Sequence, residues 1–155
     1  MDAWIAAMMP IARRGFAGIG LHMPKDPANI GGVLRAAHCY DAALVAATGK
    51  RWVRSGTDTT KAYRHLPFLQ VERLLDVVPF DCVPVAVELI EGARDLASYA
   101  HPERAFYIFG QEDGTLGANI TSKCRDIVFI PTRYCMNLAA CVNVVLYDRL
   151  AKQQR

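Results

Sequence analysis

The chain has 155 residues, of which 52% are hydrophobic and 21% charged, with 18 Lys and Arg against 15 Asp and Glu. This length and composition exclude a disordered or collagen-like chain and fit one globular domain spanning residues 1–155. The formal net charge of +3 is too small to identify a partner, so any claim of nucleic-acid binding depends on where the charges lie.

Short apolar runs alternate with helical patterns along the chain. The run Phe16–Leu21 predicts a strand, and residues 29–40 predict a helix that opens at Asn29, a good N-cap residue. We expect further strands at 42–47, 68–71, 83–87, 105–109 and 127–130, and helices or helical turns at 72–77, 95–100, 115–124 and 137–152. Strands separated by helices indicate an α/β fold, a parallel sheet with helices on both faces. Ligands bind such sheets at the carboxyl ends of the strands.

The N-terminal residues 1–15 are expected to form an extension, with a short amphipathic helix over 2–9. Asp2, Pro10 and the late Arg13 argue against a signal peptide, and no apolar stretch reaches the roughly 18 residues of a membrane helix. The five cysteines are odd in number, scattered and without a C-x-x-C pair. They predict reduced thiols in a cytoplasmic protein, with no disulfide framework and no metal site. The lack of a long apolar stretch predicts no membrane partner.

Two segments at expected strand ends stand out, although the chain has neither a P-loop nor a G-x-G-x-x-G after a strand. Residues 26–35, DPANIGGVLR, place Gly31 and Gly32 inside a helix, at a cost of roughly 1 kcal/mol each, so a packing or ligand reason is expected. Residues 109–117, FGQEDGTLG, follow a strand, open a helix and place Glu112 at the strand's carboxyl end.

A third segment, residues 130–150, reads IPTRYCMNLAACVNVVLYDRL. A strand ends here, and Asn137 then stands at the mouth of the longest expected helix. The apolar side chains in this helix recur at helical spacing, which is typical of a core or a dimer interface. They are Leu138, Val142, Val145 and Leu146.

Taken together, N-x-G-x-x-x-R, FG-x-E-x-x-x-LG and IP…MNLA…VNVVLYD resemble motifs 1, 2 and 3 of the SpoU/TrmH-type RNA ribose 2′-O-methyltransferases of the SPOUT superfamily. The resemblance covers most of residues 17–150 and is strongest to the small single-domain tRNA methyltransferases. It implies a C-terminal deep trefoil knot, an obligate homodimer, S-adenosylmethionine as cofactor and RNA, with tRNA favoured, as substrate.

The resemblance also implies catalytic side-chain roles for Asn29, Arg35, Glu112 and Asn137. Because arginine is a very poor base, we expect Arg35 to orient the ribose or phosphate and to stabilise the developing alkoxide, with Glu112 positioning Arg35 or the ribose. The positions implied for the cofactor are Val87, Glu88, Gly110, Ile130, Cys135, Met136 and Leu138. Cys135 departs from the family's usual serine, and a thiol is a weaker hydrogen-bond partner than a hydroxyl.

RNA would be held mainly through its phosphates. Between residues 50 and 73 the chain has six Lys or Arg against two acids, with Trp52, Tyr63 and His65 among them as candidates for base stacking. The predicted RNA contacts are Arg51, Arg54, Lys61, Arg64 and Arg133. A solvated basic loop explains the 50–73 segment equally well.

Three other functions remain open from the sequence. The first is an rRNA 2′-O-methyltransferase, although such enzymes often have an extra RNA-binding domain. The second is a cofactor-binding or RNA-binding homologue without catalysis, which the Cys135 departure motivates and Arg35 opposes. The third is a flavodoxin-like binding module, which should lack the Asn-Leu-Ala helix opening at Asn137.

Overall fold

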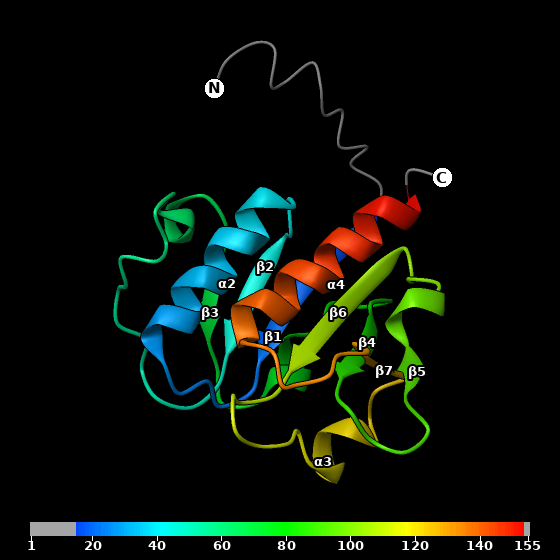
Figure 1. Ribbon diagram of the computed structural model, residues 1–155. Coiled ribbons are helices and arrows are strands. Elements are labelled where there is room, and N and C mark those ends of the chain that lie inside the picture. The colour runs from blue at the N-terminus through cyan, green and yellow to red at the C-terminus, as the bar shows by residue number, and fades with distance from the viewer. Residues whose placement is uncertain (1–14, 154–155) are drawn as a thin grey trace.

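The computed structural model describes residues 15–153, and within them a seven-stranded, wholly parallel sheet has the order β3-β2-β1-β6-β4-β7-β5 (Figure 1). The strands are β1 Phe16–Leu21, β2 Leu44–Ala47, β3 Phe68–Gln70, β4 Val83–Val87, β5 Arg94–Asp95, β6 Arg104–Phe109 and β7 Asp126–Phe129. The expected parallel α/β sheet is thus confirmed. The edge strand β5 is additional, since two polar residues give no apolar run.

Helices cover both faces of this sheet, as expected. On one face α2 (Pro27–Cys39) and α4 (Leu138–Gln153) lie side by side (Figure 1). On the other face α3 (Ala118–Thr121) and the 3₁₀ turn at Leu74–Val77 pack on Phe106 and Ile108 of β6. Two further 3₁₀ turns lie at Ala62–Arg64 and Leu96–Ser98. The apolar side of α4 faces the core that lies between α2, α4 and the sheet. Its residues Leu138, Val142, Val145 and Leu146 are all buried there.

The start of α2 differs from the sequence prediction. Asp26, not Asn29, is the N-cap, and its carboxylate accepts a hydrogen bond of 2.8 Å from the amide of Ala28. Pro27 takes the first helical position, where its fixed φ suits the helix and its missing N–H costs nothing. The prediction that Asn29 caps the helix was therefore wrong, and its side chain is released for contacts in the first turn.

The paired glycines of α2 are explained by close packing. A Cβ on Gly32 would lie only 2.8 Å from the Cβ of Ala139, so the glycine lets α2 and α4 approach each other. A Cβ on Gly31 would collide with the side chain of Thr57. The expected packing reason is confirmed for both positions.

At the amino edge of the sheet, where β1 and β6 begin, α4 is fixed by a buried arginine. Arg149 is only 5% exposed. Its guanidinium donates to the carbonyl oxygens of Pro102 and Glu103, at 2.5 and 2.6 Å, and to the hydroxyl of Tyr107 at 3.2 Å. A buried cation is tolerated here because several oxygens accept its protons.

The same arginine begins a chain of hydrogen bonds. Since the Tyr107 oxygen accepts from Arg149, its hydroxyl proton points at Nδ1 of His101, 2.6 Å away. Nε2 of His101 then donates to Asp148 at 2.8 Å, and Lys152 donates to the same carboxylate at 2.6 Å. Burial lowers the pKa of His101, although the hydrogen bond to Asp148 opposes this. The network therefore fits a neutral imidazole with its proton on Nε2.

Further sequence predictions concern the N-terminal segment, membrane-spanning helices, the cysteines and metal binding. The helix expected over residues 2–9 lies outside the described residues. Between residues 15 and 153, no helix has the length and apolar character needed to cross a membrane. All five cysteines have free thiols. The described part of the chain contains no group of three or more His, Cys, Asp or Glu side chains arranged to hold a metal ion.

Candidate active site

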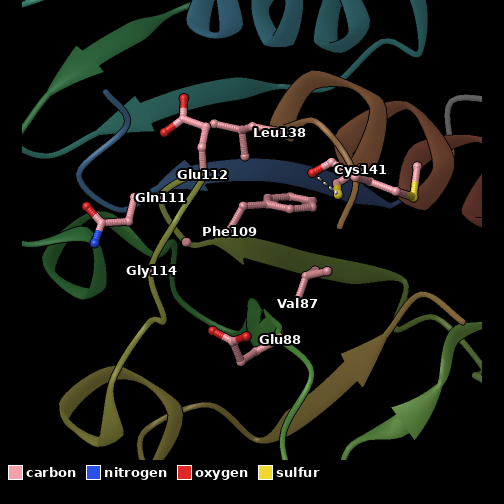
Figure 2. A pocket seen from close by; sticks show the side chains of 10 residues that line it. Val87, Glu88, Phe109, Gln111, Glu112, Gly114, Leu138 and Cys141 are labelled. Atoms are coloured by element: carbon pink, nitrogen blue, oxygen red, sulfur yellow. Dashed lines mark hydrogen bonds between the residues drawn. The ribbon is translucent and has the colours of Figure 1, made fainter. Parts of the chain in front are cut away.

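A cavity of about 110 Å³ lies at the carboxyl ends of β4 and β6 (Figure 2). These ends meet because the two strands are parallel neighbours in which Val87 is paired with Phe109. The start of α4 completes the wall. The lining residues are Val87, Glu88, Phe109, Gly110, Gln111, Glu112, Gly114, Met136, Leu138 and Cys141. The cavity thus lies where ligands bind in parallel α/β sheets.

A chain of side-chain hydrogen bonds joins the three sequence motifs beside this cavity. Nδ2 of Asn29 donates to Oε1 of Glu112 at 2.7 Å, across 83 residues of sequence. Nδ2 of Asn137 donates to Oδ1 of Asn29 at 2.5 Å, across 108 residues. Oδ1 of Asn137 accepts from the amide of Ala139 at 2.9 Å and so satisfies a free N–H at the start of α4. Three of the four predicted catalytic side chains are therefore in one connected group.

Glu112 is the acceptor on which this group converges. Besides Asn29, the backbone amides of Lys25 and Asp26 donate to its carboxylate at 3.1 and 3.4 Å. Burial opposes ionisation, but the hydrogen bonds outweigh it and hold the pKa of Glu112 below its usual value. Glu112 is thus ionised near neutral pH and occupied as an acceptor, which suits positioning better than proton abstraction.

Arg35, the fourth predicted catalytic residue, stands apart. It lies on α2 two turns after Asn29, is exposed, and makes no hydrogen bond or ion pair with any residue from 15 to 153. Glu112 contacts Asn29 and not Arg35, so within this chain it does not orient the guanidinium. The guanidinium is therefore available for an external group.

The cavity lining includes five of the seven residues predicted to contact a cofactor, namely Val87, Glu88, Gly110, Met136 and Leu138. Ile130 packs against the core instead, and Cys135 is exposed outside the lining. Glu88 also stabilises the wall, because its carboxylate accepts a 2.9 Å hydrogen bond from the amide of Leu116.

Sequence reasoning missed four lining residues: Phe109, Gln111, Gly114 and Cys141. The first three lie inside the segment 109–117 already singled out, so their positions in the motif were a usable signal. Cys141 comes three residues after Leu138, and residues at this spacing share a helix face. Nothing in the sequence distinguished it from the neighbouring core positions.

The predicted RNA-contact residues Arg51, Arg54, Lys61, Arg64 and Arg133 are all exposed. The guanidinium groups of Arg54 and Arg64 lie 5.0 and 5.8 Å from the centre of the Tyr63 ring. Trp52 packs edge-on against Phe68 and tilts against Tyr63, so both rings are partly buried. His65 stacks on His38. Arg133 belongs to a different segment, between β7 and α4.

The fold is a parallel α/β sheet with a cavity at its carboxyl edge, where such sheets bind ligands. The sequence profile of the SpoU rRNA Methylase family matches residues 18–147, so the chain belongs to this family. This confirms the expected RNA methyltransferase class, with S-adenosylmethionine as its cofactor. No functionally curated protein matches the chain in sequence.

Solved structures agree with the fold. A TrmH/SpoU tRNA modifying enzyme of A. aeolicus has a TM-score of 0.81 at 14% identity over 92% of this chain and 77% of its own. The SpoU methyltransferase AviRb from Streptomyces viridochromogenes has a TM-score of 0.81 at 21% identity, covering 99% of this chain and 65% of its own. A third structure, which concerns the 2-OH methylation of C/U34 on tRNA, has a TM-score of 0.77 at 17% identity. The match covers 100% of this chain and 99% of that one.

The cavity's lining residues fit S-adenosylmethionine. Val87, Phe109, Met136 and Leu138 give apolar walls for a purine and for the methylene groups of the methionine chain, while the Glu88 carboxylate can accept from hydroxyl groups. The cavity thus combines apolar walls with polar groups, a combination that suits a small amphipathic ligand. These residues would hold the cofactor beside the group formed by Asn29, Glu112 and Asn137.

Proposed function

We propose that this protein methylates a ribose 2′-hydroxyl of RNA and that its substrate is tRNA. The observation that supports this most directly is the hydrogen-bonded group of Glu112, Asn29 and Asn137 beside the cavity. On the helix of Asn29, Arg35 is exposed and has no side-chain partner among residues 15–153. The choice of tRNA is supported by chain length. The solved structure that concerns 2-OH methylation of C/U34 on tRNA aligns with this chain over 100% of this chain and 99% of its own.

When bound, S-adenosylmethionine supplies an electrophilic methyl group on a positively charged sulfur. Arg35 donates hydrogen bonds to the ribose or its phosphate and stabilises the charge that develops on the 2′-oxygen. Asn29 and Asn137, fixed by Glu112, form the rigid edge of the site that orients the nucleotide. The hydroxyl proton leaves to solvent, because arginine is a poor base and Glu112 has a lowered pKa and occupied oxygens.

The exposed cations Arg51, Arg54, Lys61, Arg64 and Arg133 would contact RNA phosphates. Tyr63 supports this by holding the guanidinium groups of Arg54 and Arg64 above its ring, which reduces their freedom before binding. The half-buried rings of Trp52 and Tyr63 act in this scheme as a support for the cations. His65 is exposed but already stacks on His38, so a base would add to this pair of rings.

We also propose that this single catalytic domain works as a cytoplasmic homodimer with a C-terminal trefoil knot. Exposed Tyr134 and Tyr147, at 79% and 60% accessibility, support a second copy beside α4. The knot is supported by the segments before α3 and before α4, which both reach the same cavity. Sedimentation velocity tests the dimer, and a 17.1 kDa monomer at working concentration would contradict it.

The decisive variant is Arg35→Ala. Loss of a preorganised charge-stabilising donor typically costs about 10²–10³-fold in rate, so ribose methylation should fall by that factor. The measurement uses labelled S-adenosylmethionine with pools of unmodified tRNA and rRNA transcripts, followed by mass spectrometry of the methylated ribose. Cofactor affinity, measured by isothermal titration, should stay unchanged, because Arg35 does not line the cavity.

Three results would contradict parts of the proposal. Wild-type rates in Arg35→Ala would remove the assigned role of Arg35. Transfer by the wild-type protein to rRNA alone would replace tRNA with the alternative substrate. Cofactor binding without transfer to either pool would favour a catalytically inactive homologue.

A further inference from the structure

A second cavity, of about 240 Å³, adjoins the candidate active site along the carboxyl edge of the sheet. We name it the flanking cavity, lined by Met23, Pro24, Lys25, Gly49, Lys50 and Gln111. Gln111 lines both cavities, so the two are contiguous. The walls come from the loops after β1, β2 and β6. The sheet order reverses between β1 and β6, and such a reversal is where parallel sheets open a binding crevice.

The loop after β1 is held in an unusual conformation. Met23 has a φ of +52°, a left-handed conformation that costs a residue with a side chain about 1–2 kcal/mol. The amide of Met23 donates to the buried hydroxyl of Thr48 at 3.0 Å, and the amide of Lys25 donates to Glu112. Facing Met23 is Gly49, at φ +92°, where a Cβ would lie 3.1 Å from the Met23 sulfur. The surrounding contacts thus maintain a strained loop beside the candidate active site.

The flanking cavity combines an apolar surface with positive charge. Met23 is 47% exposed, and its polarizable sulfur suits contact with an aromatic face. Lys50 is exposed and forms no ion pair with residues 15–153, whereas Lys25 pairs with Asp113 at 2.6 Å in an exposed pair. Exposed pairs contribute little stability, so a phosphate can replace Asp113 as the partner of Lys25. Gln111 adds an amide that both donates and accepts.

We propose that the flanking cavity binds the nucleotide next to the methylated one in single-stranded RNA. The base lies against Met23 and within reach of the Gln111 amide, and the phosphate lies between Lys25 and Lys50. Splayed bases on such surfaces are the usual mode of single-stranded RNA recognition. Lys50 begins the basic segment of residues 50–73, so the RNA leaves the cavity toward Arg51. This inference rests on the proposed function.

The test uses Lys50→Ala and Met23→Gly, with Lys123→Ala, an exposed lysine near α3 and outside the flanking cavity, as the matched control. Filter binding of unmodified tRNA transcripts is measured over a range of salt concentrations. Lys50→Ala should weaken binding and reduce the slope of log affinity against log salt by about 1. Met23→Gly should weaken binding about three- to tenfold with an unchanged slope. Lys123→Ala should match the wild type.

Thermal unfolding separates this role from a structural one. Glycine accepts a positive φ freely, so Met23→Gly should fold with an unchanged or higher melting temperature while it binds RNA less tightly. Cofactor affinity should be unchanged in all three variants. Wild-type RNA affinity in both Lys50→Ala and Met23→Gly would overturn the inference, as would failure of the wild-type protein to bind the transcripts. Binding that depends on both residues without methyl transfer would support the flanking cavity and contradict the proposed function.

Discussion

The two ends of α4 lie in polar clusters of opposite character. At the amino edge of the sheet, Arg149 and His101 are buried, and their donors and acceptors are satisfied inside the protein. At the carboxyl edge, Asn137 is exposed and bonds to Asn29 of α2, the helix on which Arg35 has no partner among the described residues. Buried and fully paired charges stabilise a helix position, whereas exposed and unpaired ones are available to a ligand. The C-terminal end of α4 is therefore anchored inside the protein, whereas its N-terminal end borders the candidate active site.

The largest expected effect on stability comes from breaking the anchored end. Arg149→Ala removes the donor of the Pro102 carbonyl oxygen and one of the two donors of the Glu103 carbonyl oxygen, which also accepts from the amide of Phe16. A hydrogen bond from a charged group contributes about 1.5–3 kcal/mol. We expect a loss of about 3 kcal/mol in the free energy of unfolding, measured by urea denaturation. Arg73→Ala, which removes an exposed ion pair with Asp76, is the control and should change stability by less than about 0.5 kcal/mol. Equal losses of unfolding free energy in the two variants would show that the buried Arg149 stabilises the fold no more than the exposed Arg73 does.

The next effect tests the functional end. In Glu112→Gln, an amide nitrogen replaces one of the two ionised oxygens and faces either the amide of Lys25 or the donors of Asp26 and Asn29. Loss of this charge-assisted acceptor should cost about 1–3 kcal/mol in transition-state stabilisation, which is roughly a ten- to hundredfold drop in kcat/KM. The exposed Glu91→Gln is the isosteric control and should retain wild-type kinetics. Full activity in Glu112→Gln would show that the carboxylate does not position the site.

The smallest effect is a pH dependence at the anchored end. Because burial lowers the pKa of His101 in the folded protein, the unfolded chain binds more protons as the pH falls through the usual value of 6.5. Stability is therefore present above pH 6.5 and falls below it, by at most about 1.4 kcal/mol per pH unit for one proton. Unfolding of wild type and His101→Gln from pH 7.5 to 5 measures this, and the variant should have the flatter profile.

An unchanged slope in His101→Gln would mean that His101 titrates alike in the folded and unfolded protein.

The sequence predicted those elements of the fold whose structure depends on local residue patterns. The runs Phe16–Leu21 and Val83–Val87 are strands with the expected bounds, because unbroken apolar segments are stable only when buried in a sheet covered on both faces. The helix expected over 115–124 is limited to Ala118–Thr121. Its first residues are held back because the amide of Leu116 bonds to Glu88, a contact between distant segments.

The candidate site was predictable as a set of residues but not as an arrangement. The motifs indicated Asn29, Glu112 and Asn137, yet the direct bond between Asn29 and Asn137 depends on how closely α2 and α4 pack. The flanking cavity had no sequence signal. It arises because Met23 has a left-handed backbone conformation and lies opposite Gly49, which also has a positive φ. These two residues come together only when the ends of β1 and β2 meet.

The hydrogen bond between Asn29 and Asn137 has a consequence for the order of events in the cell. It joins the first helix after β1 to a residue that the ribosome adds 108 positions later. During synthesis a nascent chain can therefore form β1 and α2 long before it has an active site. Competence for methylation would begin only when α4 docks, so the protein would not methylate RNA near the ribosome until residues 137–153 have been synthesised.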